Sequence, residues 1–179
     1  MSMKRPDGAQ NDLLIRAYQD DDADAVQRLF IKVNRLLAPP DMMDAFEGYI
    51  ERSLTEEIGR VGAYFAERDG GFWVAISGGA LAGMFGLEPS ENGMELRRMY
   101  VDPSIRRRGV ARRMLTRAEQ EARSAGAVQL DLSTSELQEA ALGLYQKAGY
   151  ELVRKEVATT SSNKVLGGGL TRFHFVKKL

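Results

Sequence analysis

The feature that most constrains this fold is one continuous stretch, residues 94–134, in which a strand, a helix and a second strand are expected to follow one another. Met94–Val101 ("MELRRMYV") is expected to be a strand, and after a loop Val110–Gly126 has the apolar spacing of a helix that ends at glycine. Ala127–Thr134 ("AVQLDLST") is expected to be the next strand. A strand–helix–strand unit places its two strands parallel in one sheet, with a right-handed crossover.

Patterns on both sides of this unit predict further strands and helices. The expected helices run from Asp20 or Asp21 to Leu37, from Asp41 to Ile58 and from Glu136 to Gly149. The expected strands are Leu13–Tyr18, Phe72–Ile76 and Ala80–Leu87, which would form a hairpin, and the final pair 150–160 and 170–179. The predicted order is β-α-α-β-β-β-α-β-α-β-β. This is an α/β fold (α+β mixed sheet) with helices on its faces and antiparallel hairpins on its flanks.

Length and composition restrict the domain count and the class of partner. A chain of 179 residues is expected to form a single domain, here 13–179, after a disordered tail at 1–12. The 25 basic residues equal the 25 acidic ones, which argues against a nucleic-acid partner. No run approaches the roughly 18 apolar residues that span a bilayer. We therefore expect a cytoplasmic protein without a membrane partner.

The chain contains no cysteine, which excludes disulfides, thiolate nucleophiles and cysteine-ligated metal sites. No metal is expected. The lone histidine, His174, alternates with Phe173 and Phe175 on the last strand, where a structural or interface role is expected rather than catalysis.

The basic segment "RRRGVA" (Arg106–Ala111) stands where the loop enters the helix at Val110. The first N–H groups of a helix lack intrahelical acceptors and carry the positive end of the macrodipole. Gly109 allows close approach to the backbone, and Arg106, Arg107 and Arg108 add positive charge. These features favour a phosphate or pyrophosphate site. The P-loop pattern GxxxxGK[ST] and the dinucleotide pattern GxGxxG both fail here.

Two segments resemble signatures of the GCN5-related N-acetyltransferase (GNAT) family. "LRRMYVDPSIRRRGVARRML" is similar to the family's acetyl-CoA signature, with Arg106, Gly109 and Ala111 at its key positions. "AALGLYQKAGY" is similar to the second signature. The residues that match it are Ala141, Leu144, Tyr145 and Gly149, while Tyr150 replaces a phenylalanine and Gln138 stands where asparagine is common.

The resemblance implies an acyltransferase that uses acetyl-CoA as co-substrate. The implied cofactor-binding residues are Met99, Tyr100, Val101, Arg106, Arg107, Arg108, Gly109, Val110, Ala111, Arg112 and Gln138. Within this set the 106–112 turn would hold the pyrophosphate, Met99 and Val101 would pair with the pantetheine arm, and an N–H near Met99 or Tyr100 would stabilise the oxyanion. The thioester would lie where the two parallel strands splay apart, and an amine would attack it directly in a ternary complex.

Tyr145 is implied as the general acid, and Glu95 is the candidate general base. Glu88, or a water molecule, is the alternative base, and a solvent-facing structural role is equally open for Glu95. The implied acceptor is a primary amine, with a small molecule slightly favoured over a peptide or protein. Its pocket would be built from Asp41–Ile58 and Ser161–Gly169.

The sequence leaves three further possibilities open. The chain could be a regulatory module that binds acyl-CoA with little turnover, or a nucleic-acid-binding protein that uses the arginine cluster. A homodimer through the late strands, involving Phe173 or Phe175, is also open.

Overall fold

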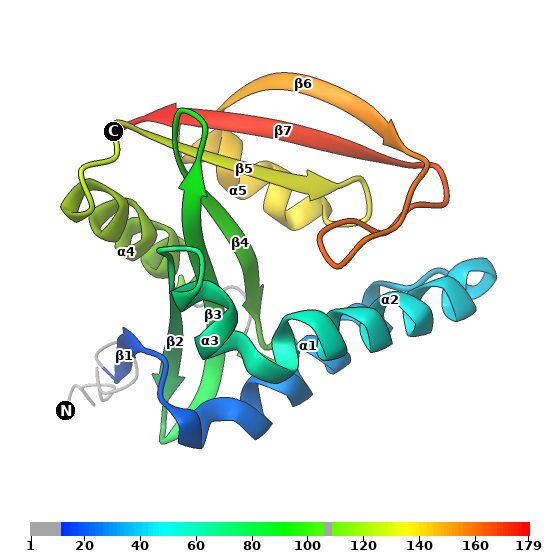
Figure 1. The fold of residues 1–179 in the computed structure, drawn as a ribbon, viewed down its shortest axis with the longest axis horizontal. Coiled ribbons are helices and arrows are strands. Elements are labelled where there is room, and N and C mark those ends of the chain that lie inside the picture. The colour runs from blue at the N-terminus through cyan, green and yellow to red at the C-terminus, as the bar shows by residue number, and fades with distance from the viewer. Residues whose placement is uncertain (1–11, 106–108) are drawn as a thin grey trace, which may run out of the picture.

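The computed structural model describes residues 12–105 and 109–179 (Figure 1). The strands are β1 (Leu13–Ala17), β2 (Gly71–Ser77), β3 (Ala80–Ser90), β4 (Gly93–Val101), β5 (Gln129–Ser135), β6 (Glu151–Ala158) and β7 (Leu170–Lys178). The α-helices are α1 (Ala23–Leu37), α2 (Met43–Glu56), α3 (Val61–Ala66), α4 (Val110–Ser124) and α5 (Glu139–Lys147). Single 3₁₀ turns precede α1, α2 and α3 at Asp20–Asp22, Pro40–Met42 and Ile58–Arg60, and another follows β4 at Pro103–Ile105.

The seven strands form one mixed sheet in the order β1-β2-β3-β4-β5-β7-β6. β4 and β5 are parallel neighbours joined through α4, and every other neighbouring pair is antiparallel. The predicted mixed α/β sheet with antiparallel flanks is therefore confirmed.

Some predicted bounds were wrong. Residues 59–67 were given no element, yet α3 forms there and buries Val61, Tyr64 and Phe65. Glycines at 59 and 62 interrupt the helical pattern, and six residues are too few to show a period. The last helix begins at Glu139 rather than Glu136, because Ser135 to Gln138 forms a turn first.

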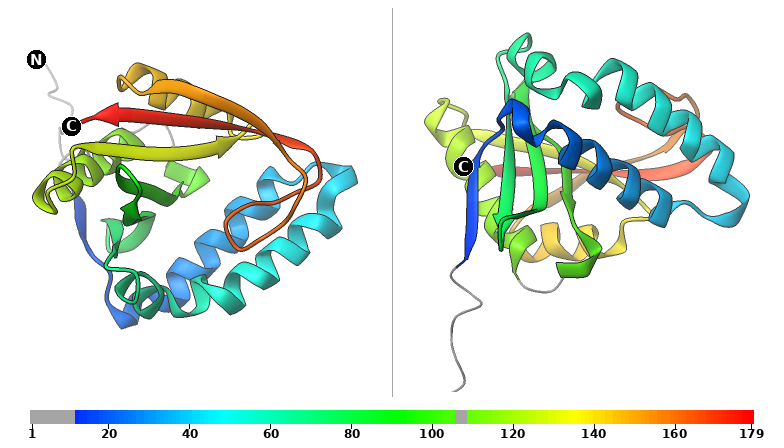
Figure 2. Two further views of the ribbon diagram at one scale, coloured as in Figure 1. Left: turned by 45° about the horizontal axis from the view of Figure 1, so that its top comes forward. Right: turned by 90° about the horizontal axis from the view of Figure 1, so that it is seen from below.

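Helices lie on both faces of the sheet (Figure 2), and apolar side chains pack between them and the strands. One cluster joins α1, α2 and α3 to one face of β2 and β3, with Phe30 and Phe65 fully buried at its centre. The other joins α4 and α5 to the opposite face, around Met114, Leu130 and Phe175. Burial of this area is the main stabilising contribution to the fold.

The two parallel strands separate soon after they meet. β4 pairs with β5 only from Met94 to Leu96, opposite Leu130 to Leu132, although β4 continues to Val101 and β5 to Ser135. Figure 1 shows the ends of the two strands diverging. Beyond Leu96, the edge of β4 that faces β5 has no strand partner, so its backbone groups face a gap in the middle of the sheet.

Candidate functional site

A cavity of about 210 Å³ lies at this gap. Its walls include residues of two central strands, one N-terminal helix and one late loop, together with residues of α1, α5 and β7. β4 contributes Glu95 to Tyr100, and β5 contributes Ser133 to Ser135. α2 contributes Phe46 and Tyr49, and the β6–β7 loop contributes Lys164 to Leu166. Both segments that the family resemblance implied for the acceptor pocket therefore reach the cavity.

β4 carries a bulge where it borders the cavity. Met84 of β3 is opposite Tyr100 and Gly86 is opposite Arg97, so β4 has one extra residue between these pairs. Arg98 lies in this bulge with φ +55°. A non-glycine residue in the left-handed region costs on the order of 1–3 kcal/mol, and surrounding contacts must hold it there. The bulge turns backbone groups of β4 away from the regular ladder.

The contacts that hold the bulge centre on Glu57, whose side chain is fully buried. Arg98 Nε lies 3.0 Å from Glu57 Oε1 and Arg98 Nη2 lies 2.7 Å from Oε2. Arg97 Nη2 donates to the same Oε2 at 3.1 Å. Burial alone would raise the pKa of Glu57, but the hydrogen bonds and charges of Arg98 and Arg97 outweigh it and lower that pKa below its ordinary value.

The same cluster holds the loop between β6 and β7. Asn163 Nδ2 donates to Glu57 Oε2 at 3.1 Å and to the Tyr64 hydroxyl at 3.2 Å. The Asn163 carbonyl accepts a hydrogen bond from Arg98. The loop therefore depends on the same buried carboxylate as the bulge.

Tyr145 of α5 lies beside the cavity and is 6% exposed. Its hydroxyl is 4.0 Å from Met99 Sδ, and its ring packs against Tyr150 and Phe175. Burial, with a smaller effect of Tyr100, raises the pKa of Tyr145 well above its ordinary value. The hydroxyl thus stays protonated and can act as a hydrogen-bond donor in the cavity.

The two candidate bases are cross-strand neighbours, because Glu88 of β3 is opposite Glu95 of β4. Glu95 lines the cavity, and its side chain is 31% exposed. Glu88 is 4% exposed and forms a 2.6 Å ion pair with Lys164, with Arg97 at 3.6 Å. Lys164 Nζ also lies 3.8 Å from Glu95. Glu95 is therefore the candidate base with the better access to an acceptor.

The N-terminus of α4 begins at Gly109, which has φ +74°. Arg113 N donates to the Gly109 carbonyl at 3.1 Å and closes the first turn, so the N–H groups of Val110, Ala111 and Arg112 precede the intrahelical ladder. A Cβ at Gly109 would meet no atom within 4 Å among the described residues, so the backbone angle, rather than space, calls for glycine. Arg106, Arg107 and Arg108, predicted to bind the pyrophosphate, lie outside the described residues.

The remaining predicted cofactor residues lie around the gap. Met99 and Tyr100 line the cavity, and Val101 ends β4 opposite Gly83. Gln138 also lines the cavity, and its Oε1 accepts a 2.7 Å hydrogen bond from Thr134 Oγ1. The structure thus places an unpaired strand edge and a buried tyrosine at one cavity.

A model of the acetyltransferase (GNAT) family matches residues 35–150 of the chain, which is more than half of it. The chain belongs to the GNAT family. Human N-acetyltransferase 8 is 31% identical over 110 residues, which cover 58% of this chain and 48% of that protein. The IAA acetyltransferase of Azospirillum brasilense is 38% identical over 87 residues, covering 48% of this chain and 57% of that one.

The PaiA N-acetyltransferase from Thermoplasma acidophilum, solved in complex with coenzyme A, superposes with a TM-score of 0.71 at 18% identity. That match covers 93% of this chain and 99% of the other and confirms the GNAT fold. The chain spans about half the length of the curated relatives it matches.

Sequence reasoning missed several residues of this GNAT site. Glu57, Arg97, Arg98 and Asn163 were not singled out, although a signal was present in "ELRRMY". Two adjacent arginines interrupt the inward–outward alternation of a central strand, and both are buried. Such a pair indicates a bulge and calls for a buried carboxylate elsewhere in the chain.

The last strand holds two further residues for which roles were predicted from the sequence, His174 and Phe175. His174 lines the cavity, and its Nε2 lies 2.7 Å from Glu156 Oε1. Phe175 is 1% exposed and packs on Tyr145, so its suggested part in a dimer surface was wrong. Within the described residues, no group of three or more His, Cys, Asp or Glu side chains could hold a metal, and no helix is long and apolar enough to cross a membrane.

Proposed function

We propose that this GNAT protein transfers an acetyl group from acetyl-CoA to the nitrogen of a primary amine, by direct attack in a ternary complex. The observation that carries the proposal is the gap between β4 and β5, which is bordered by Tyr145 and lined by Met99 and Tyr100. Bound acetyl-CoA would supply an activated acyl group. The chain's own residues would bind and orient acetyl-CoA, accept the proton of the amine and donate a hydrogen bond to the leaving thiolate.

The family resemblance, together with the positions of the described residues, supports a role for each group. The N–H groups of Val110, Ala111 and Arg112 would hold the pyrophosphate, and Arg106, Arg107 and Arg108, which precede them in the sequence, would add positive charge. The unpaired edge of β4 at Met99 and Val101 would pair with the amides of the pantetheine arm. A backbone N–H near Met99 or Tyr100, next to the bulge, would stabilise the oxyanion that develops on the carbonyl. Gln138 would border the same arm.

Glu95 would accept the proton that the amine loses, directly or through a water molecule. Tyr145 would donate a hydrogen bond to the departing thiolate. Because its pKa is raised, it assists departure mainly as a donor rather than by complete proton transfer. Lys164 Nζ lies between the two carboxylates, 2.6 Å from Glu88 and 3.8 Å from Glu95.

The proposal is tested in two steps on the purified protein. Acetyl-CoA should raise the melting temperature, because a ligand at 100 times its Kd stabilises the folded state by about 2.7 kcal/mol. Thiol release from acetyl-CoA should then depend on added amine, in a panel of polyamines, amino acids, aminoglycosides and peptides. Stabilisation without thiol release from any amine would favour the regulatory acyl-CoA-binding module instead. The cytoplasmic location, the single domain, the absence of metal and nucleic-acid partners and the homodimer stay predictions from the sequence and family.

A further inference from the structure

Arg172 of β7 brings a guanidinium group to the wall of the cavity. Its Nη2 donates a 2.8 Å hydrogen bond to Ser133 Oγ, on the neighbouring strand. Its Nε is buried and has no hydrogen-bond partner among the residues that the structure describes. A buried donor without an acceptor costs about 1–3 kcal/mol, and more when it is charged. The site therefore keeps an unfavourable feature that a ligand would remove.

The other arginine and lysine side chains at the cavity have carboxylate partners. Glu57 pairs with Arg97 and Arg98, and Glu88 pairs with Lys164 at 2.6 Å. No carboxylate between residues 12 and 105 or between 109 and 179 lies within 4.0 Å of the Arg172 guanidinium.

The charges of two carboxylates, Glu156 and Glu95, act on Arg172, but neither carboxylate pairs with it. Glu156 of β6 is opposite Arg172 in the ladder, yet it bonds to His174 at 2.7 Å. Glu95 acts on Arg172 electrostatically from the β4 wall. Burial lowers the pKa of Arg172 from its ordinary value despite these charges, although a guanidinium stays protonated in proteins.

We infer that Arg172 binds a carboxylate on the acceptor, and that the acceptor is therefore a free amino acid or another small amine that carries a carboxylate. The inference deepens the proposed function and rests on it. A guanidinium has a planar fork of N–H donors that matches a carboxylate, and the buried Nε would gain its missing acceptor. A carboxylate would also neutralise the unpaired charge.

The charges of the cavity fit a zwitterion rather than a dianion. Arg172 on β7 supplies the positive charge, and Glu95 on β4 supplies a negative charge that would face the ammonium group. A phosphate would bring a second negative charge toward Glu95. The volume, about 210 Å³, is below the roughly 300–1,000 Å³ typical of sites for drug-sized ligands, and Met99, Tyr100 and Gln138 of the same cavity would contact acetyl-CoA, so the space for the acceptor is small.

The test uses matched acceptors that differ by the carboxylate. Thiol release is measured with the standard amino acids, with the corresponding amines that lack the carboxylate (phenethylamine for phenylalanine, cadaverine for lysine), and with O-phosphoethanolamine. The wild type should use at least one amino acid with a kcat/KM at least about tenfold above that of its decarboxylated counterpart, since a charge-assisted hydrogen bond is worth about that much.

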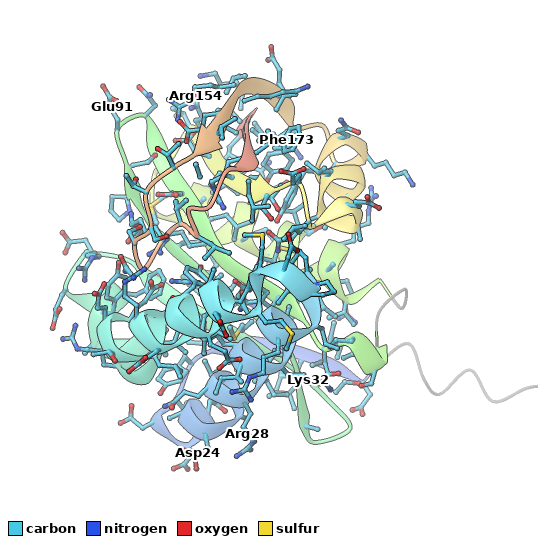
Figure 3. All side chains as sticks on the ribbon, turned by 90° about the vertical axis from the view of Figure 1, so that its right-hand side faces the viewer. Asp24, Arg28, Lys32, Glu91, Arg154 and Phe173 are labelled. Atoms are coloured by element: carbon cyan, nitrogen blue, oxygen red, sulfur yellow. The ribbon has the colours of Figure 1, made fainter. Side chains whose placement is uncertain are left out.

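Arg172→Gln should raise the KM for the amino acid by about 10–100-fold and leave the KM for the matched amine within about threefold. Arg172→Lys should recover part of the loss, because it keeps the charge but not the fork. Arg154→Gln is the control, because Arg154 lies on the neighbouring strand β6 and its side chain is 61% exposed. Figure 3 shows Arg154 and Phe173 on this pair of strands. Arg154→Gln should change neither KM appreciably.

The outcomes separate this inference from the proposed function. If acetyl-CoA stabilises the protein and amines release thiol, but amino acids, their decarboxylated counterparts and O-phosphoethanolamine are used equally well, the inference fails and the proposed function stands. A preference for O-phosphoethanolamine, or an equal loss for both acceptor types in Arg172→Gln, also overturns it. If acetyl-CoA neither stabilises the protein nor releases thiol with any amine, the proposed function fails first.

Discussion

Glu57 Oε2 accepts a 2.7 Å hydrogen bond from Arg98 Nη2, although the two residues are 41 positions apart in the chain. The contact connects the end of α2 to the bulge in β4, and both side chains are nearly inaccessible to solvent. A residue with φ +55° therefore keeps its conformation because a buried ion pair fixes its side chain.

Replacing Glu57 should cost much of the protein's stability. Glu57→Gln keeps the shape but leaves Arg97 and Arg98 without their shared carboxylate, and breaking a buried ion pair costs about 3–5 kcal/mol. Urea unfolding followed by circular dichroism measures the loss. Glu47→Gln is the matched control, because its pair with Arg35 lies on the surface at 2.8 Å and should contribute little. Equal losses of unfolding free energy in the two variants would show that the buried cluster contributes no more than a surface ion pair.

The cost of Glu57→Gln should depend on pH. The pKa of Glu57 is depressed in the folded state, so its contribution is complete above the ordinary glutamate value of about 4.3 and is lost as the pH falls through the folded pKa. The difference in unfolding free energy between wild type and Glu57→Gln should therefore be constant near neutrality and shrink below about pH 4.3. A difference that grows on acidification would contradict the assigned direction of the pKa.

Gly109→Val should abolish the rise in melting temperature that acetyl-CoA causes. The β-branched residue disfavours φ +74° by about 1–2 kcal/mol, so the turn that opens α4 would shift and misplace its N–H groups. Gly78→Val carries the same kind of strain at φ +58° in the β2–β3 turn, where a Cβ also meets no atom within 4 Å among the described residues. It should lower the melting temperature comparably but keep the response to acetyl-CoA. A normal ligand response in Gly109→Val would show that the turn is not the pyrophosphate site.

Tyr145→Phe should lower kcat by about 10²-fold, a typical contribution of a positioned proton donor, while the affinity for acetyl-CoA stays nearly constant. Tyr150→Phe also removes a buried hydroxyl, one that donates to Glu119 Oε1 at 3.0 Å. That control should lose stability and keep turnover. Steady-state kinetics and a thermal shift on both proteins separate the two effects, and an unchanged kcat in Tyr145→Phe would remove its role in departure of the thiolate.

Local patterns in the sequence predicted most of the fold. The unit from Met94 to Thr134 specified the parallel pair because handedness and element order leave few alternatives. The proposed pyrophosphate turn and Tyr145 were singled out because their neighbours in the chain resemble family signatures. Residues that depend on distant partners were not predictable in this way. Glu57 is one of many glutamates until β4 folds against it. Arg172 looks like any strand arginine until the fold shows that no carboxylate of the described residues pairs with it.

The dependence of the β6–β7 loop on Glu57 through Asn163 has a consequence for changing this protein by design. The loop at the proposed acceptor side and the bulge at the proposed acetyl-CoA side are not independent modules, because one carboxylate contacts both. A graft that exchanges residues 161–169 for a loop from another acetyltransferase must keep an amide at position 163. Without this amide, a loop exchange intended to change the acceptor would also disturb the geometry of the β4 bulge.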